Sequence, residues 1–122
     1  MSKLVRISSF RPKSFSACLR QLHRDLDRAQ FAQVHQYKDF LQTVRGHFLS
    51  ISRKKKDISL EEAAKHLEIP WMLLEVIEKG QAPITDIAFI HLCQHYGTTH
   101  EALILTEKIE KTVVPKLQNT KN

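Results

Sequence analysis

Residues 58–103 read ISLEEAAKHLEIPWMLLEVIEKGQAPITDIAFIHLCQHYGTTHEAL, and this stretch decides the fold. Ser59 and Glu62 form an S-x-x-E pattern, which is typical of a capping box at the start of a helix. Pro70 interrupts that helix and is tolerated at the beginning of a new one. Gly80 stands where a left-handed C-cap would end the second helix. The stretch therefore predicts two short helices joined by a tight turn, over 60–67 and 71–79.

The remainder of the stretch is also predicted to be helical. Pro83 and Thr85 open one helix that Gly97 ends, and the run Thr-Thr-His-Glu at 98–101 caps a further helix. Only three Gly and four Pro occur in 122 residues, which argues against long loops. Two short helices joined by a turn of three or four residues, within a helical domain, form a helix-turn-helix. The predicted fold class is therefore all-α.

Upstream of this stretch, apolar residues recur at steps of three and four between residues 15 and 51. This spacing predicts helix, either as one long helix within residues 14–56 or as two with a break near 33–36. The apolar stripe either packs on the rest of its own monomer or serves as a dimerisation helix. We divide the chain into a mostly helical N-terminal extension, a helix-turn-helix domain and a flexible C-terminal tail, at 1–40, 41–110 and 111–122.

The formal net charge is +6, and it is unevenly distributed. Residues 1–28 hold seven Lys/Arg and two acids, residues 29–56 hold six and one, and residues 57–97 hold two and seven, so these segments carry +5, +5 and −5. A basic chain favours polyanionic partners. No stretch of about 18 apolar residues is present, which predicts a chain without a membrane span, and no signal peptide is evident, which predicts a cytoplasmic location.

The sequence contains few residues that suggest catalysis or metal binding. Cys18 and Cys93 are isolated, without the spacing of a disulfide framework or a zinc finger. His91 and His95 stand four residues apart on a predicted helix, but no third ligand accompanies them. We therefore expect no metal, no cofactor and no enzymatic activity.

The predicted domain resembles the phage-repressor, Cro and xenobiotic-response-type helix-turn-helix family over about 60 residues. The similar positions are the capped helix two at 58–64, the core residues Ile69 and Ile77, a Glu-x-Gly signature at 78–80, Gly97 seventeen residues further on, and Gly46 and Arg53 in the first helix. The resemblance implies a lambda-repressor-like helix-turn-helix bundle with a helical N-terminal extension. It also implies a DNA-binding transcriptional regulator whose recognition helix, at 71–79, enters the major groove.

Double-stranded DNA is accordingly the predicted partner, bound by a homodimer. Basic residues at the end of the first helix would hold phosphates, although the same charges also suit the dipole of a helix C-terminus. Polar residues of the two short helices would supply the remaining contacts. The predicted DNA-binding residues are Arg53, Lys54, Lys55, Lys56, Ser59, Lys65, Trp71, Met72, Glu75, Lys79 and Gln81.

The outward side of the recognition helix also permits a different function. Direct base readout needs donors and acceptors such as those of Arg, Lys, Asn or Gln, and Trp71, Met72 and Leu73 offer almost none. The acidic balance of residues 57–97 also opposes contact with phosphates. The alternative is a protein-interaction module, such as a co-regulator, an antitoxin-like partner or an assembly partner, that uses these three residues. Trp71 would otherwise pack against the N-terminal extension of its own chain.

Overall fold

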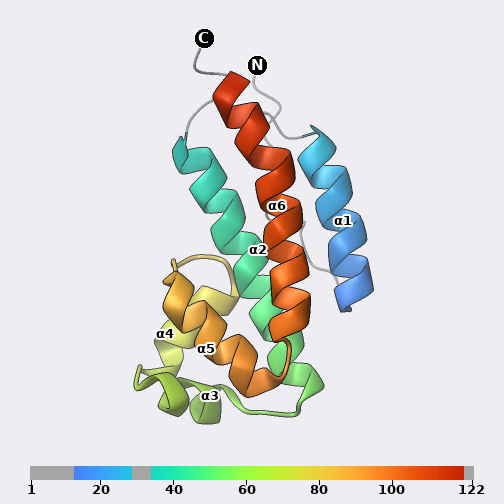
Figure 1. Ribbon diagram of the computed structural model, residues 1–122. Helices are drawn as coiled ribbons and strands as arrows, with labels where there is room; N and C mark the ends of the chain where they lie inside the picture. The colour runs from blue at the N-terminus through green and yellow to red at the C-terminus, as the bar shows by residue number, and fades with distance from the viewer. Residues whose placement is uncertain (1–12, 29–33, 120–122) are drawn as a thin grey trace.

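The computed structural model describes residues 13–28 and 34–119, and within them the chain is entirely helical (Figure 1). The prediction of an all-α protein is confirmed for this part of the chain. The helices of the described residues are α1 (Phe15–Arg28), α2 (Val34–Lys55), α3 (Leu60–Leu67), α4 (Trp71–Glu78), α5 (Asp86–Tyr96) and α6 (Thr99–Asn119).

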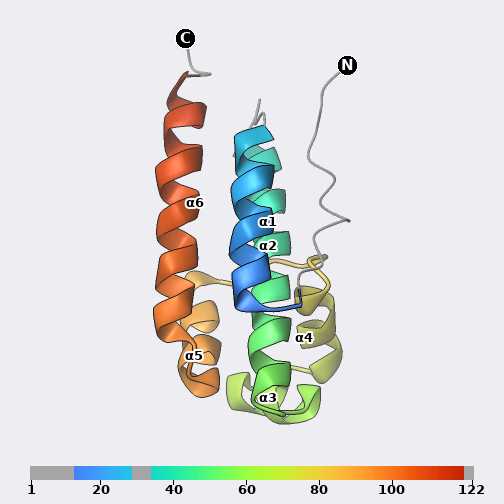
Figure 2. The ribbon, with the colours of Figure 1, turned by 90° about the vertical axis from the view of Figure 1, so that its right-hand side faces the viewer.

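The helices form two groups that share α2. Helices α1, α2 and α6 lie side by side in the upper part of the molecule, and α3, α4 and α5 surround the C-terminal half of α2 at the lower end (Figures 1 and 2). Helix α2 is 22 residues long and contacts α1, α4, α5 and α6. None of the helices in the described ranges is both long enough and apolar enough to cross a membrane.

Local signals in the sequence place the helix ends. The Ser59 hydroxyl accepts a hydrogen bond from the Glu62 amide at 3.1 Å, as the capping-box pattern predicts. The Thr85 hydroxyl caps α5 in the same way. Gly80 and Gly97 both adopt positive φ, at 76° and 74°, and follow the ends of α4 and α5. The two predicted short helices are therefore present, with the second ending one residue earlier than expected.

The N-terminal apolar stripe packs within its own chain. Cys18 and Leu22 of α1 are completely buried, and Phe15 makes an edge-to-face contact with Phe48 of α2, with ring centroids 5.9 Å apart. Helix α1 also packs along α6. The described part of this stripe is consequently an intramolecular face, and a dimer would have to use a different surface.

The helical groups also extend across the predicted boundaries. Helix α2 runs through the expected boundary at 40/41, and α6 continues to Asn119, past the start of the expected tail at 111. The described part of the stretch 14–56 contains the two helices α1 and α2. Residues 34–36 of the expected break already belong to α2, and residues 29–33 lie outside the described residues. Helix α2 is therefore shared between the predicted N-terminal extension and the predicted helix-turn-helix domain.

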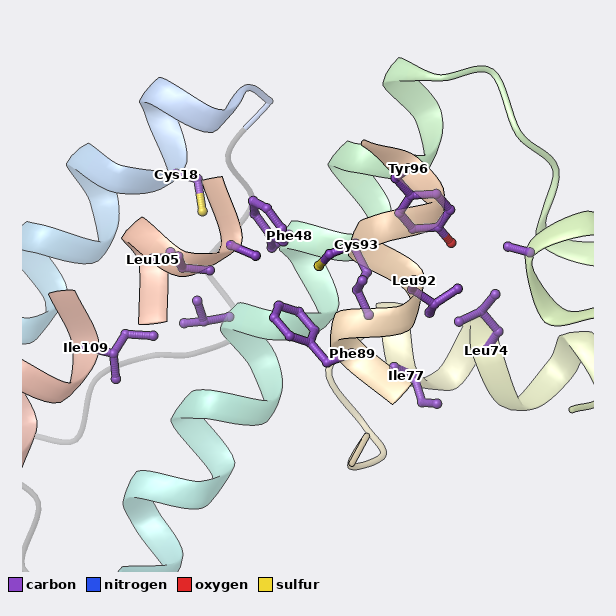
Figure 3. Packing of buried hydrophobic residues seen from close by; sticks show 14 of the residues in the cluster. Cys18, Phe48, Leu74, Ile77, Phe89, Leu92, Cys93, Tyr96, Leu105 and Ile109 are labelled. Carbon is purple, nitrogen blue, oxygen red and sulfur yellow. The ribbon is translucent and has the colours of Figure 1, made fainter. Parts of the chain in front are cut away.

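One apolar cluster joins the two groups of helices (Figure 3). Phe48 of α2 lies between α1 and α5, and its ring centroid is 6.0 Å from that of Phe89. Burial of such side chains supplies most of the favourable free energy of folding. The buried apolar residues are Cys18, Leu22, Phe40, Val44, Phe48, Leu49, Ala63, Ala64, Leu74, Ile77, Phe89, Leu92, Cys93, Tyr96, Ala102, Leu105 and Ile109.

Candidate nucleic-acid interface

Helices α3 and α4 form two short, directly connected helices at the lower end of the molecule. Glu68 ends α3 in the left-handed conformation, with φ of 57°, and its amide donates to carbonyl groups of the last turn of α3. Pro70 then precedes α4 in extended conformation. The three residues 68–70 form the turn that the sequence predicted. The two helices pack against each other, and α4 also packs on α2.

Close backbone contact fixes α4 against α2. A methyl group at Gly46 of α2 would overlap the carbonyl oxygen of Ile77, so only glycine allows this approach. Gly80 lies directly against Thr43 of α2, and its carbonyl accepts a hydrogen bond from Gln42 Nε2 at 3.0 Å. These contacts hold the inner side of α4 against α2. They therefore also determine which side of α4 faces outward.

The predicted phosphate contact at Arg53 is not supported by its position. Arg53 is buried, and its guanidinium donates from Nε and Nη2 to the two carboxylate oxygens of Glu78, at 2.7 and 3.0 Å. Nη1 donates to the carbonyl of Ile58 at 2.8 Å. Hydrogen bonding to Glu78 raises the pKa of Arg53 further above its ordinary value. Arg53 thus joins α2 to α4, and its charge is neutralised inside the protein.

The outward side of α4 is mainly apolar. Trp71, Met72 and Leu73 are 44%, 59% and 43% exposed. Glu75 is half-buried and Lys79, just after α4, is exposed, so the charges on this side balance. The alternative contact of Trp71 with the N-terminal extension involves residues 1–12, which lie outside the described residues.

The other predicted contact residues are exposed and surround the two short helices. Lys54 and Lys55 end α2, and Lys56 follows it. Ser59 is exposed, although its hydroxyl is already used as the α3 cap. Lys65 lies on α3 and Gln81 in the segment after α4. The structure therefore leaves all predicted residues except Arg53 at least partly accessible to a ligand.

A surface hollow of about 840 Å³ adjoins this region. It runs across α2 and includes residues from the segment before α1, from α4 and from the start of α6. Its lysines are Lys13, Lys54, Lys55 and Lys79. Nothing in the sequence associates Lys13 with the other three lysines, because it lies far from them along the chain. The hollow is also lined by residues other than lysine, among them His47, Phe48, Ile51, Glu75 and Glu101.

The remaining polar clusters do not form a metal site. His95 stacks on His66 of α3, with ring centroids 4.2 Å apart and nearly parallel planes. The described residues contain no group of three or more His, Cys, Asp or Glu that could hold a metal ion. Burial raises the pKa of the Cys18 and Cys93 thiols to about 12, which disfavours the nucleophilic thiolate of either residue.

Comparisons with protein-family models, with curated proteins and with solved structures found no match for this chain. The function of α3 and α4 is consequently inferred from their geometry, from the exposed side chains around them and from the distribution of charge.

Proposed function

We propose that the chain is a DNA-binding transcriptional regulator with a lambda-repressor-like helix-turn-helix. The observation that carries the proposal is the α3–turn–α4 unit, whose second helix is fixed on its inner side and open on its outer side. In a helix-turn-helix, the second helix enters the major groove and the first crosses the backbone. Here α4 would be the recognition helix, and Lys65 of α3 would face the backbone.

The side chains of α4 favour binding that depends more on phosphates than on bases. Met72 and Trp71 can contact thymine methyl groups or sugars, but they offer little hydrogen bonding to base edges. Glu75 can accept a hydrogen bond from cytosine. Most affinity would then come from lysines beside the helices, so we expect steep salt dependence and a modest preference for particular sequences.

A fluorescence-anisotropy titration with labelled duplex DNA tests this proposal. The logarithm of affinity should fall linearly with the logarithm of salt concentration from 50 to 200 mM, because protein binding releases counterions from the DNA. The Lys54→Ala and Lys65→Ala variants should each bind more weakly with an unchanged circular-dichroism spectrum. Failure of the wild-type protein to bind any duplex at low salt, its own promoter region included, would refute it.

A second function is favoured by the exposure of Trp71, Met72 and Leu73. Aromatic side chains often contribute strongly to protein interfaces, and a contiguous apolar patch is typical of such surfaces. On this alternative, α4 binds another protein and the chain is a co-regulator, an antitoxin-like partner or an assembly component. A Met72→Ser variant that keeps its circular-dichroism spectrum but loses a stable co-purifying protein would support it; equal retention of that protein would contradict it.

The expected homodimer remains a separate prediction, because the described part of α1 is already used within the chain. Sedimentation velocity over a range of concentrations tests it. A single species of 14.2 kDa at every concentration would contradict a dimer.

A further inference from the structure

The hollow beside α4 collects lysines that are distant in the sequence. Lys13 precedes α1, Lys54 lies in the last turn of α2, and Lys79 follows α4, yet all three line the same depression. Lys55 lines it as well. All four are exposed, so their ammonium groups are available to a ligand from solvent.

The acidic residues of the hollow only partly offset these charges. Glu75 and Glu101 are half-buried in its wall. Glu78 also lines the hollow, but its carboxylate is neutralised by the two hydrogen bonds from Arg53. Four lysines against two acids leave the hollow positive, although residues 57–97 are acidic as a whole. The fold therefore brings positive charge from the first half of the chain to the side of α4.

We propose that this hollow receives the sugar-phosphate backbone of one DNA strand, held by Lys13, Lys54 and Lys79. The inference rests on the proposed function and assigns part of the interface to Lys13, outside the helix-turn-helix. A duplex fits the arrangement because its charges are spread along a line, with one phosphate for about every 3.4 Å of axis on each strand. The lysines likewise come from three separate segments of the chain: the residues before α1, the end of α2 and the residue after α4.

The size of the effect follows from counterion release. Each neutralised phosphate contributes about 0.9 to the slope of log affinity against log salt, so removal of three contacts should reduce the slope by about 2.7. Between 50 and 200 mM salt, the wild-type protein should therefore lose roughly 40-fold more affinity than the variant without these three contacts. Lys13→Ala alone should reduce the slope by about 0.9.

The test compares two triple variants of the full chain by anisotropy, using a labelled duplex of random sequence. Lys13→Ala, Lys54→Ala and Lys79→Ala are combined in one; the matched control combines Arg20→Ala, Arg24→Ala and Lys38→Ala, which are exposed residues outside the hollow. Both variants lose three positive charges, so a general effect of net charge is the same in each. Equal melting temperatures verify that both are folded.

We expect the salt slope of the hollow variant to fall by about 2.7 and that of the control variant to stay near the wild-type value. Glu75→Gln should bind several-fold more tightly, because it removes a negative charge that faces the strand. Equal slopes for the two triple variants, or an unchanged slope for Lys13→Ala, would overturn the inference while leaving DNA binding established. Absence of binding by the wild-type protein would instead refute the proposed function, and the backbone site with it.

Discussion

The buried ion pair between Arg53 and Glu78 should make a large contribution to stability that a single substitution reveals. Their side chains are only 11% and 7% exposed, and the carboxylate accepts two hydrogen bonds from the guanidinium. Glu78→Ala leaves the guanidinium buried without its counter-charge, although the bond to Ile58 remains. Removal of one partner from such a pair typically costs about 3–5 kcal/mol. At about 4 °C for each kcal/mol, the melting temperature should fall by roughly 12–20 °C.

Urea denaturation followed by circular dichroism measures this loss, and two further variants control it. Arg53→Met combined with Glu78→Leu should recover most of the stability, because well-packed apolar side chains often replace a buried pair at little cost. The side chain of Asp86, which pairs with Arg45, is 84% exposed. Asp86→Ala should therefore cost at most about 1 kcal/mol. A loss below 1 kcal/mol for Glu78→Ala, or no recovery of stability in the double variant, would refute the assignment of Arg53 as a structural residue.

Three further substitutions or conditions probe the helix contacts and the core. Gly46→Ala should destabilise the protein by about 1–3 kcal/mol, despite the better helix propensity of alanine, since its methyl group meets the Ile77 carbonyl; increased stability in urea would contradict the close contact. Ser59→Ala should cost about 1 kcal/mol in the same assay through loss of the α3 cap, and no change would contradict the cap. Burial raises the pKa of the Cys18 and Cys93 thiols from an ordinary value near 9 to about 12. As pH rises, the thiols therefore ionise first in the unfolded chain, which stabilises that state. The free energy of unfolding should consequently fall between pH 9 and 12, by about 1.4 kcal/mol per thiol per pH unit. Urea denaturation at pH 8 and pH 10 checks this. The same change in the free energy of unfolding for the wild type and for a Cys18→Ala, Cys93→Ala variant would contradict it.

The two short helices α3 and α4 could be predicted because their signals are local. Ser59 caps a helix through an amide three residues away, and Pro70 and Gly80 act on the backbone at their own positions. Such effects depend on short-range geometry that the sequence contains directly. Consequently the bounds of α3 and α4 were predicted to within one residue.

The environment of each charge could not be predicted in the same way. Arg53 is followed by three lysines, and nothing nearby in the chain distinguishes it from them. Its partner, Glu78, stands 25 residues away, and the packing of α4 on α2 brings the two together. The presence of Lys13 in the same hollow as Lys79 depends in turn on the packing of α1. These are tertiary contacts between distant segments, so helical periodicity carries no information about them.

Helix α1 packs against α6. During synthesis, this contact cannot form until α6, the last described helix, has left the ribosome. Roughly 70 residues separate Arg28 from Thr99, and a ribosome adds about 5–20 residues each second. Cys18 and Leu22 therefore emerge several seconds before the helix that covers them. A nascent chain that stops before α6 would present this apolar face to chaperones and proteases. Loss of the C-terminal helix should thus be expressed as low abundance of the protein in the cell, before any effect on binding is measured.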